Sequence, residues 1–423
     1  MKKTSFERGQ VNRIRLHVLP TDQFKTYAIS AYIGAQLTDE SVTSTALIPF
    51  VLRRGTQSFP ETKQFREHLD DLYGAGFGFD IYKRGDYQMV QFRMDLIQDQ
   101  FVAESESLLT QALQFLGEVL TQPALENNQF IDKYVEAEKR TVQKRIEAII
   151  NDKVRYAAER CIEEMCKNEP YRLHPLGKIE DLTFLDSQLL FQQYKQWLMQ
   201  APIDLYIVGN ATLDEVMPIV KAAFRLPASA EIINYQMIPV PKDVVTVQTI
   251  IEKLDVKQGK LNMGLRTNIT YAHELYAASL MYNGVLGAYP HAKLFTNVRE
   301  KASLAYYASS RLDGHKGILT IQSGIEMENY DKALRIIQDQ LHAMVEGAIS
   351  PLELSQTRAM IANQLREMQD AAFELISFDF NSILSGVERT VPALLESIEQ
   401  VDLQAIQQVA QKVQLDTIYF LRD

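Results

Sequence analysis

The two halves of the sequence repeat one pattern of residues, and this repeat restricts the folds that the chain can adopt. Arg66 and Tyr73 are seven residues apart, Arg299 and Tyr306 have the same spacing, and a glutamate directly follows each arginine. Both members of the second pair lie 233 residues after those of the first, the difference between 299 and 66 and between 306 and 73. A chain of 423 residues is also too long for one ordinary hydrophobic core. We therefore expect two similar domains that arose by duplication.

The periodicity after each Arg-Tyr pair predicts strands followed by a long helix. Apolar and polar residues alternate from 90 to 96, the period of a strand with one buried face. From 109 to 120 and from 334 to 344 apolar residues recur every three or four positions, as on the buried side of a helix. Gly347 follows the second helix where a C-terminal cap belongs. These elements predict an α+β fold of two homologous domains, each with an antiparallel-rich mixed β-sheet covered on one face by α-helices.

A segment rich in proline divides the sequence into two parts. Residues 225–244, RLPASAEIINYQMIPVPKDV, contain three prolines and show no helical period, which is typical of a linker. We accordingly place an N-terminal domain at 1–226, the linker at 227–243 and a C-terminal domain at 244–423.

The charge and the cysteine content exclude several kinds of partner. The chain has 44 lysines and arginines against 54 aspartates and glutamates, a formal net charge of −10, so no basic excess is available for nucleic acid or for an anionic membrane. Only two cysteines occur, Cys161 and Cys166, which indicates a reducing compartment without a disulfide framework. The first residues contain no apolar core of a signal peptide, and no apolar run is long enough to span a membrane. We expect a cytoplasmic protein.

A short apolar segment carries the most informative resemblance. Residues 44–56, STALIPFVLRRGT, predict a helix with a proline inside it. Their last eleven residues resemble the helix HFLEHMLFxGT of the insulinase or pitrilysin-type (inverzincin) zinc peptidases in length, apolar character and the closing Gly55-Thr56. This family includes the mitochondrial processing peptidase and bacterial two-subunit homologues. The segments YRLHPLGKIEDL, LYIVGNATLDEVMPIVKAAF and LFTNVREKASLAYYASS extend the resemblance, in order, over nearly the whole chain. The resemblance implies one half of a clam-shell, made of two domains with a metallohydrolase-like fold.

The same resemblance implies that the zinc site is degenerate. The family's two zinc-binding histidines and the glutamate between them fall on three residues that neither bind metal nor move a proton: Ala46, Phe50 and Pro49. The helix with the third ligand matches KRIEAIINDK, which puts Lys144 and Arg145 at the two acidic positions, and cations repel Zn²⁺. With that helix shifted by one turn Glu147 would stand nearby, but one carboxylate without the histidines is no zinc site. We expect no metal ligands and no cofactor in this chain, zinc only in a partner subunit, and an apolar helix kept for packing.

Arg299 and Tyr306 match a pair that the family uses to contact substrate. The resemblance implies that they reach across the chamber to the substrate carbonyl next to the metal, where a guanidinium and a phenol suit a developing oxyanion. The alternative is a structural role, with Arg299 in an ion pair and Tyr306 packed in the sheet, as for Arg66 and Tyr73 in the first half.

Three other patterns are weaker. The segment QFREH at 64–68 differs from HxxEH by a glutamine, which favours a structural or solvated His68. Cys161, Cys166 and His174 supply too few ligands for zinc. The glycines of GAGFG at 74–78 lead into a strand instead of a helix, which predicts a turn and not a phosphate loop.

The leading hypothesis is a non-catalytic subunit of an insulinase-family zinc peptidase. It would pair with a zinc-bearing homologue or with a second copy of itself, and would contribute contacts to a peptide that adds as a strand to a sheet edge. The first alternative is a peptide-binding or structural scaffold with no hydrolytic role. The second is a peptidase active alone through an unrecognised site.

Overall fold

The computed structural model divides the chain into two compact units. It describes residues 5–102, 106–226, 231–237 and 241–423. The first unit comprises residues 1–147 and 173–236, and the second comprises 148–172 and 237–423. The predicted linker therefore includes residues 227–230 and 238–240, which lie outside the described residues. The segment 148–172 interrupts the first unit in sequence and belongs to the second.

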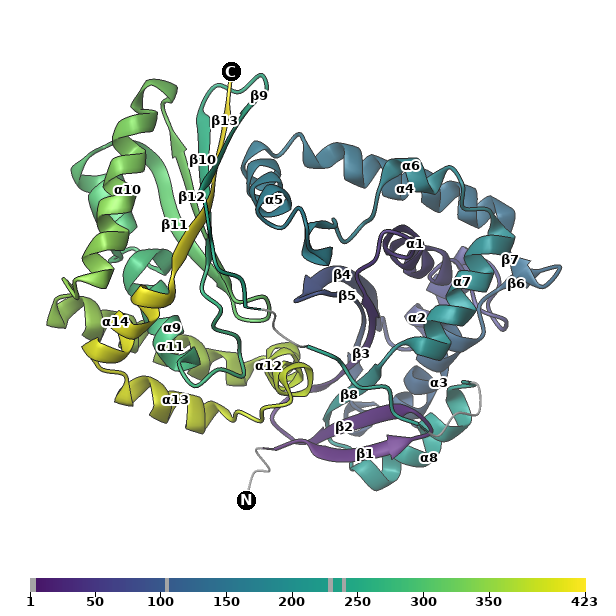
Figure 1. Ribbon diagram of the computed structural model, residues 1–423. Helices are drawn as coiled ribbons and strands as arrows, with labels where there is room; N and C mark the ends of the chain where they lie inside the picture. The colour runs from purple at the N-terminus through teal and green to yellow at the C-terminus, as the bar shows by residue number, and fades with distance from the viewer. Residues whose placement is uncertain (1–4, 103–105, 227–230, 238–240) are drawn as a thin grey trace. The chain divides into compact units, whose positions relative to one another are not determined.

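The first unit contains a six-stranded sheet in the order β1-β2-β8-β3-β5-β4 (Figure 1). Its strands are β1 (Glu7–Val11), β2 (Ile14–Pro20), β3 (Thr26–Gln36), β4 (Gly76–Arg84), β5 (Tyr87–Ile97) and β8 (Ile203–Gly209). Only β2 and β8 are parallel, and all the other neighbours are antiparallel. Among the described strands β4 pairs with β5 alone, so one side of its backbone is a sheet edge.

Helices cover this sheet through apolar faces that the sequence pattern predicts. They are α1 (Val42–Leu52), α2 (Thr62–Asp71), α3 (Leu108–Thr121), α4 (Asp132–Ile149), α6 (Ile179–Leu182), α7 (Ser187–Gln200) and α8 (Leu213–Ala223), with a small hairpin of β6 (Leu125–Glu126) and β7 (Gln129–Phe130). The helix expected at 109–120 is α3, and all its predicted core positions are buried. It packs on α8 and on β5.

The second unit repeats the topology of the first. Its sheet has the order β11-β12-β10-β13-β9, with strands β9 (Gln248–Lys253), β10 (Gly259–Arg266), β11 (Ala305–Asp313), β12 (Ile318–Ile325) and β13 (Gln414–Arg422). Taken in sheet order, β11, β12, β10, β13 and β9 correspond to β4, β5, β3, β8 and β2. The one parallel pair of this sheet, β13 with β9, corresponds to β8 with β2. The expected α+β fold of two homologous domains with antiparallel-rich sheets is therefore confirmed.

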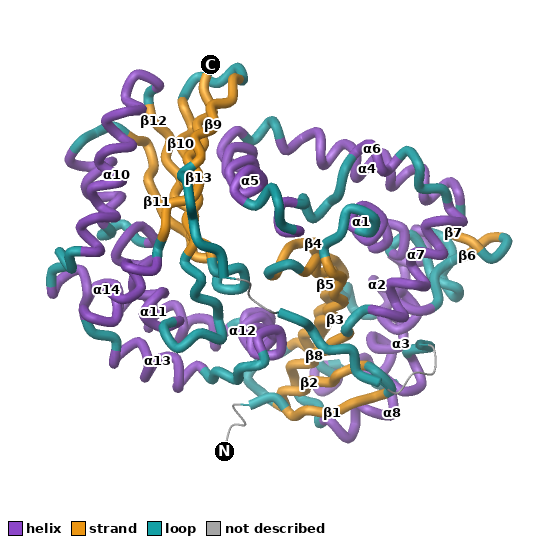
Figure 2. The backbone as a smooth tube through the Cα atoms, in the orientation of Figure 1, coloured by secondary structure: helices purple, strands orange, loops and turns teal. Residues whose placement is uncertain are grey.

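Helices lie on both faces of the second sheet, in contrast to the one face expected (Figure 2). The helical elements of this unit are α5 (Lys153–Met165), α9 (Tyr276–Asn283), α10 (Tyr330–Val345), α11 (Pro351–Glu367), α12 (Ala372–Ser385), α13 (Val391–Gln400) and α14 (Leu403–Lys412), with the π-helical turns η3 (Gly284–Ala288) and η4 (Phe295–Lys301). On β13, Ile418 and Phe420 join the core beneath α10 and α14, whereas Tyr419 and Leu421 pack with Cys161 of α5. Because successive strand residues point to opposite faces, α5 covers the second face.

Buried ion pairs hold the segment 148–172 to its unit. The Arg266 guanidinium of β10 lies 2.7 Å from the Glu169 carboxylate and 2.9 Å from that of Asp416, and Lys316 lies 2.9 Å from Glu169. Burial opposes ionisation of Glu169, but hydrogen bonds from Arg266 and Lys316 and their charges lower its pKa to about 2.

None of the helices in the described part of the chain combines the length and the apolar character that a membrane span requires.

Candidate functional site

The helix α1 carries the three degenerate motif positions in the core of the first unit. It begins at Val42 and ends at Leu52, and each of its residues is buried, Ala46 and Phe50 with 0% exposure. Pro49 lies inside the helix, well past the first turn, although a proline there costs roughly 3 kcal/mol. Since most residues of the helix are apolar and all are buried, burial of its side chains offsets that cost.

The ring of Phe50 brings two arginines together at the degenerate site. The Arg145 guanidinium of α4 lies 4.8 Å from the centroid of the Phe50 ring, and the Arg53 guanidinium lies 5.3 Å from it. Both distances are those of cation–π contacts. The ring of Phe79 on β4 meets Phe50 edge-on at 4.9 Å, and Arg53 is also 5.4 Å from the Phe79 centroid. The structure thus brings the position of the second histidine, Phe50, beside one of the two cations matched to the third ligand.

Lys144, the other cation, takes no part in this cluster. It is exposed on α4 and forms no hydrogen bond or ion pair within the described part of the chain. Glu147 is exposed as well, and its carboxylate accepts a hydrogen bond from Gln143 at 2.7 Å. Neither residue contributes a ligand to α1.

A buried carboxylate that the sequence pattern did not predict lies beside the end of α1. Glu138 of α4 has a side chain only 1% exposed, and it lies 2.5 Å from Arg54 and 3.5 Å from Arg53. The signal that could have found it is its spacing, because Val135, Glu138 and Val142 recur at three and four residues along one helix face. Two arginines neutralise this carboxylate, which therefore does not act as a free base.

The side chains at the degenerate site do not suit zinc. Alanine and phenylalanine offer no donor atom, and the nearby guanidiniums repel a cation. Among the described residues, no three histidine, cysteine, aspartate or glutamate side chains gather in a way that could hold a metal ion.

Arg299 and Tyr306 lie at the surface of the second unit. Arg299 belongs to η4, and its guanidinium lies 4.6 Å from the ring centroid of Phe295. Tyr306 stands at the start of β11, is 64% exposed, and donates a hydrogen bond to the Glu326 carboxylate at 2.9 Å. That hydrogen bond and the negative charge of Glu326 raise the pKa of the Tyr306 phenol. Arg299 keeps N–H donors at an accessible surface, whereas the Tyr306 O–H, also at the surface, donates to Glu326 and must exchange that partner to reach a substrate.

The weaker sequence patterns have structural surroundings. His68 is partly buried and stacks on Phe59 with 4.2 Å between ring centroids, and burial lowers its pKa. Cys161 and Cys166 are buried and form no disulfide within the described residues, and burial raises the pKa of the Cys161 thiol. Gly74 has a φ of 71°, so the glycine-rich stretch is the predicted turn into β4.

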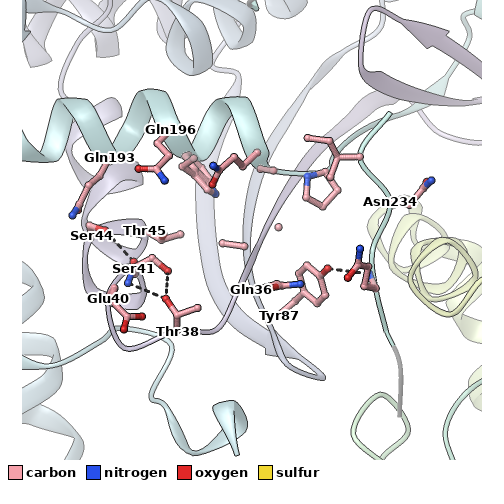
Figure 3. Close-up of a pocket in the computed structure, with 18 residues that line it drawn as sticks. Gln36, Thr38, Glu40, Ser41, Ser44, Thr45, Tyr87, Gln193, Gln196 and Asn234 are labelled. Carbon is pink, nitrogen blue, oxygen red and sulfur yellow. Dashed lines mark hydrogen bonds between the residues drawn. The ribbon is translucent and has the colours of Figure 1, made fainter. Parts of the chain in front are cut away.

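A polar cavity of about 450 Å³ lies beside the first turn of α1 (Figure 3). Its wall includes Thr38 and Ser41, whose hydroxyl oxygens are 2.8 Å apart, and Tyr87, whose hydroxyl accepts a hydrogen bond from the Gln236 backbone at 2.9 Å. Glu40 supplies a carboxylate, but no histidine or cysteine lines the cavity. None of the three degenerate motif positions lines the cavity.

Comparisons with known proteins agree with this geometry. A family model described as "Peptidase M16 inactive domain" matches residues 185–361. A protein of Bacillus subtilis (strain 168) named "Probable inactive metalloprotease YmfF" is 40% identical over 408 residues, which cover 96% of this chain and 95% of the relative.

Solved structures show the same fold over the full length. A conserved protein from Enterococcus faecalis V583 superposes with a TM-score of 0.92 at 29% identity, over 99% of this chain and 98% of that one. A structure described as a peptidase M16 inactive domain from Pseudomonas fluorescens superposes with a TM-score of 0.79 at 15% identity, over 99% and 98% of the two chains. At that lower identity the likeness concerns the fold alone.

Proposed function

The chain belongs to the M16 metallopeptidases, the insulinase or pitrilysin-type family, and on that premise we propose that it is a non-catalytic subunit that pairs with a zinc-bearing homologue. The observation that carries the proposal is the fate of α1. The motif helix is kept and fully buried, while its ligand positions hold Ala46, Pro49 and Phe50 and a guanidinium stacks on the last of these. The name of the Bacillus subtilis relative, a probable inactive metalloprotease, supports the same reading.

The contribution of this subunit to catalysis is to donate hydrogen bonds. Arg299 and Tyr306 present a guanidinium and a phenol at the surface of the second unit. Donors of this kind stabilise the negative charge that develops on a peptide carbonyl oxygen during hydrolysis. The metal and its bound water belong to the partner, since the residues of this chain do not fit them.

The open edge of β4 is the place where peptide substrate joins this subunit. β4 has nine residues and a hydrogen-bonding partner on one side only, so an extended peptide can add to it as a further strand. Phe79 of β4 touches Phe50, which puts the strand directly beside the degenerate helix.

The cytoplasm is the proposed location, and a zinc-bearing homologue is preferred to a second copy as partner. Neither cysteine forms a disulfide within the described residues, in keeping with a reducing compartment. A pair of two such chains would have no suitable zinc site, because α1 lacks ligands in both. A pull-down with the tagged chain from native lysate should recover a homologue with an intact HxxEH motif.

The donor role is tested by substitution in the reconstituted pair. Arg299→Ala and Tyr306→Phe should each lower kcat for peptide hydrolysis about 100-fold, because each removes a donor to the oxyanion. Arg66→Ala and Tyr73→Phe are matched controls, since the same residue types occupy the equivalent places of the first repeat and are exposed. The controls should retain full activity.

Unchanged activity of both Arg299→Ala and Tyr306→Phe, with pairing intact by size-exclusion chromatography, would remove this proposal. It would leave a peptide-binding or structural scaffold as the better account.

A further inference from the structure

The cluster of Phe50, Arg53 and Arg145 has the chemistry of an anion site. Three guanidiniums, those of Arg53, Arg54 and Arg145, surround the end of α1, and one carboxylate, that of Glu138, balances them. The guanidinium of Arg54 lies 2.5 Å from the Glu138 carboxylate, and that of Arg53 lies 3.5 Å from it. Within the described residues no carboxylate pairs with Arg145, so positive charge remains in excess.

The guanidinium of Arg145 contacts the Phe50 ring and still has N–H groups available to a ligand. Its central carbon lies 4.8 Å from the Phe50 centroid, and within the described residues no hydrogen bond takes up the N–H groups of this exposed side chain. Arg53 lies on the same ring and has a side chain 37% exposed. A planar guanidinium with a free edge binds carboxylates through two parallel hydrogen bonds.

The open edge of β4 determines what can reach these guanidiniums. Phe79 lies near the middle of β4, three residues after Gly76 and five before Arg84, and Arg53 lies 5.4 Å from its ring. On a paired strand, side chains opposite one another on the same face have Cβ atoms about 5 Å apart. A strand added to β4 therefore points a central side chain toward Arg53 and Arg145.

We propose that the degenerate zinc site is a carboxylate-binding subsite, in which Arg145 and Arg53 on the Phe50 ring bind an aspartate or glutamate side chain of a peptide added to β4. This inference rests on the proposed function in one respect, that peptide enters as a strand on β4. A side chain is favoured over a C-terminal carboxylate, because β4 continues on both sides of Phe79 and a bound peptide passes the cluster with its middle residues.

Peptide binding to the purified chain tests this inference by fluorescence anisotropy. The probes are labelled, C-terminally amidated peptides of nine residues, the length of β4, with alternating Val and Thr and a central Glu or a central Gln. The Glu peptide should bind about tenfold more tightly, since a hydrogen bond to a charged group is lost with Gln, and the difference should shrink with added salt.

Two variants of neighbouring residues then locate the preference. Arg145→Gln should remove the tenfold difference, while Lys144→Gln, which deletes the same charge about 100° away around α4, should keep it. Arg145→Lys should retain part of it, because the charge survives without the planar fork. Thermal unfolding of each variant checks that the exposed substitutions leave the fold intact.

Three results would overturn the inference. Equal binding of the Glu and Gln peptides to the wild-type chain would remove the carboxylate subsite and leave strand addition to β4 standing. Equally tight binding of a central-Gln peptide with a free C-terminus would assign the cluster to a chain terminus instead of a side chain. Binding of neither peptide would remove the strand edge together with the subsite, whereas the donor role of Arg299 and Tyr306 is decided separately by the partner's activity.

Discussion

At the scale of single residues, α1 shows how a metal site can be lost without losing its helix. Histidines and a glutamate buried without a metal would leave polar groups unsatisfied, at a cost of several kcal/mol. Ala46, Pro49 and Phe50 remove those groups, and all three are buried in the core of the first unit. Phe50 gains a second role, because two guanidiniums lie against its ring.

Replacement of Pro49 should stabilise the chain. Pro49→Ala restores the backbone N–H that can bond to the carbonyl of residue 45, and part of the gain is lost with the contacts of the ring. The free energy of unfolding, measured by chemical denaturation, should rise by about 1–2 kcal/mol. Pro218→Ala in α8, where a proline also lies inside a helix, is the comparison and should shift in the same direction.

Loss of stability in Pro49→Ala together with a gain in Pro218→Ala would contradict this expectation. It would mean that the ring of Pro49 fills space in the core that alanine leaves empty.

At the scale of elements, the segment 148–172 belongs to the second unit although in sequence it lies between two parts of the first. Its helix α5 covers one face of the second sheet. Glu169, near the end of the segment, is surrounded by Arg266, Lys316 and Lys242. Removal of a buried carboxylate that is paired with several cations strongly destabilises a fold, because the cations are left unpaired.

Glu169→Gln should therefore destabilise the chain in a pH-dependent way. The folded pKa of about 2 lies below the ordinary value of 4.5, so the ionised carboxylate stabilises the fold above pH 4.5 and this stabilisation is lost as the pH falls toward 2. Denaturation at pH 7 should show a loss of about 3 kcal/mol, and denaturation near pH 2.5 a much smaller one. Glu163→Gln, a half-exposed partner of Arg160 on α5, is the control and should change stability by less than about 1 kcal/mol at either pH. An equal loss at both pH values would show that the charge of Glu169 is not what matters.

These elements also show what local sequence patterns can and cannot predict. The period of two in β5 and the period of three to four in α3 and α10 are visible because each depends on neighbours in sequence. The place of α5 depends on Glu169 meeting Arg266, a residue 97 positions away, which no local period records. Burial of Glu138 could not be predicted because a charged residue on a buried helix face is unusual unless it is paired, and its partners Arg53 and Arg54 follow α1, more than 80 positions earlier in the chain. The contact of Arg145 with Phe50 could not be predicted either, because it forms only where α4 and α1 meet in the fold.

At the scale of the whole molecule, two domains of one topology carry different surfaces. The strands β4 and β11 occupy the same place in their sheets, and each has one open side. In the first domain the edge lies beside the arginine cluster, and in the second it begins with the exposed Tyr306. Although the chain as a whole carries a net charge of −10, the cluster at α1 is cationic, so an acidic peptide meets attraction there.

The purified chain alone should contain no stoichiometric zinc and cleave no peptide. Elemental analysis by mass spectrometry after dialysis against zinc should give well under one metal ion per chain, because no described cluster supplies enough ligands. The co-purified partner, measured in the same way, is the positive control. One tightly held zinc ion together with peptide cleavage by the lone chain would revive an enzyme active by itself.

The position of β13 has a consequence for biosynthesis. This strand, residues 414–422, lies between β10 and β9 in the second sheet, and α5 packs against it. While the ribosome is still upstream of residue 414, β10 and β9 have no strand between them, and α5 lacks its contacts with β13. The nascent chain therefore remains vulnerable to aggregation until β13 has been synthesised, which makes the pairing of this strand the step at which the second sheet closes.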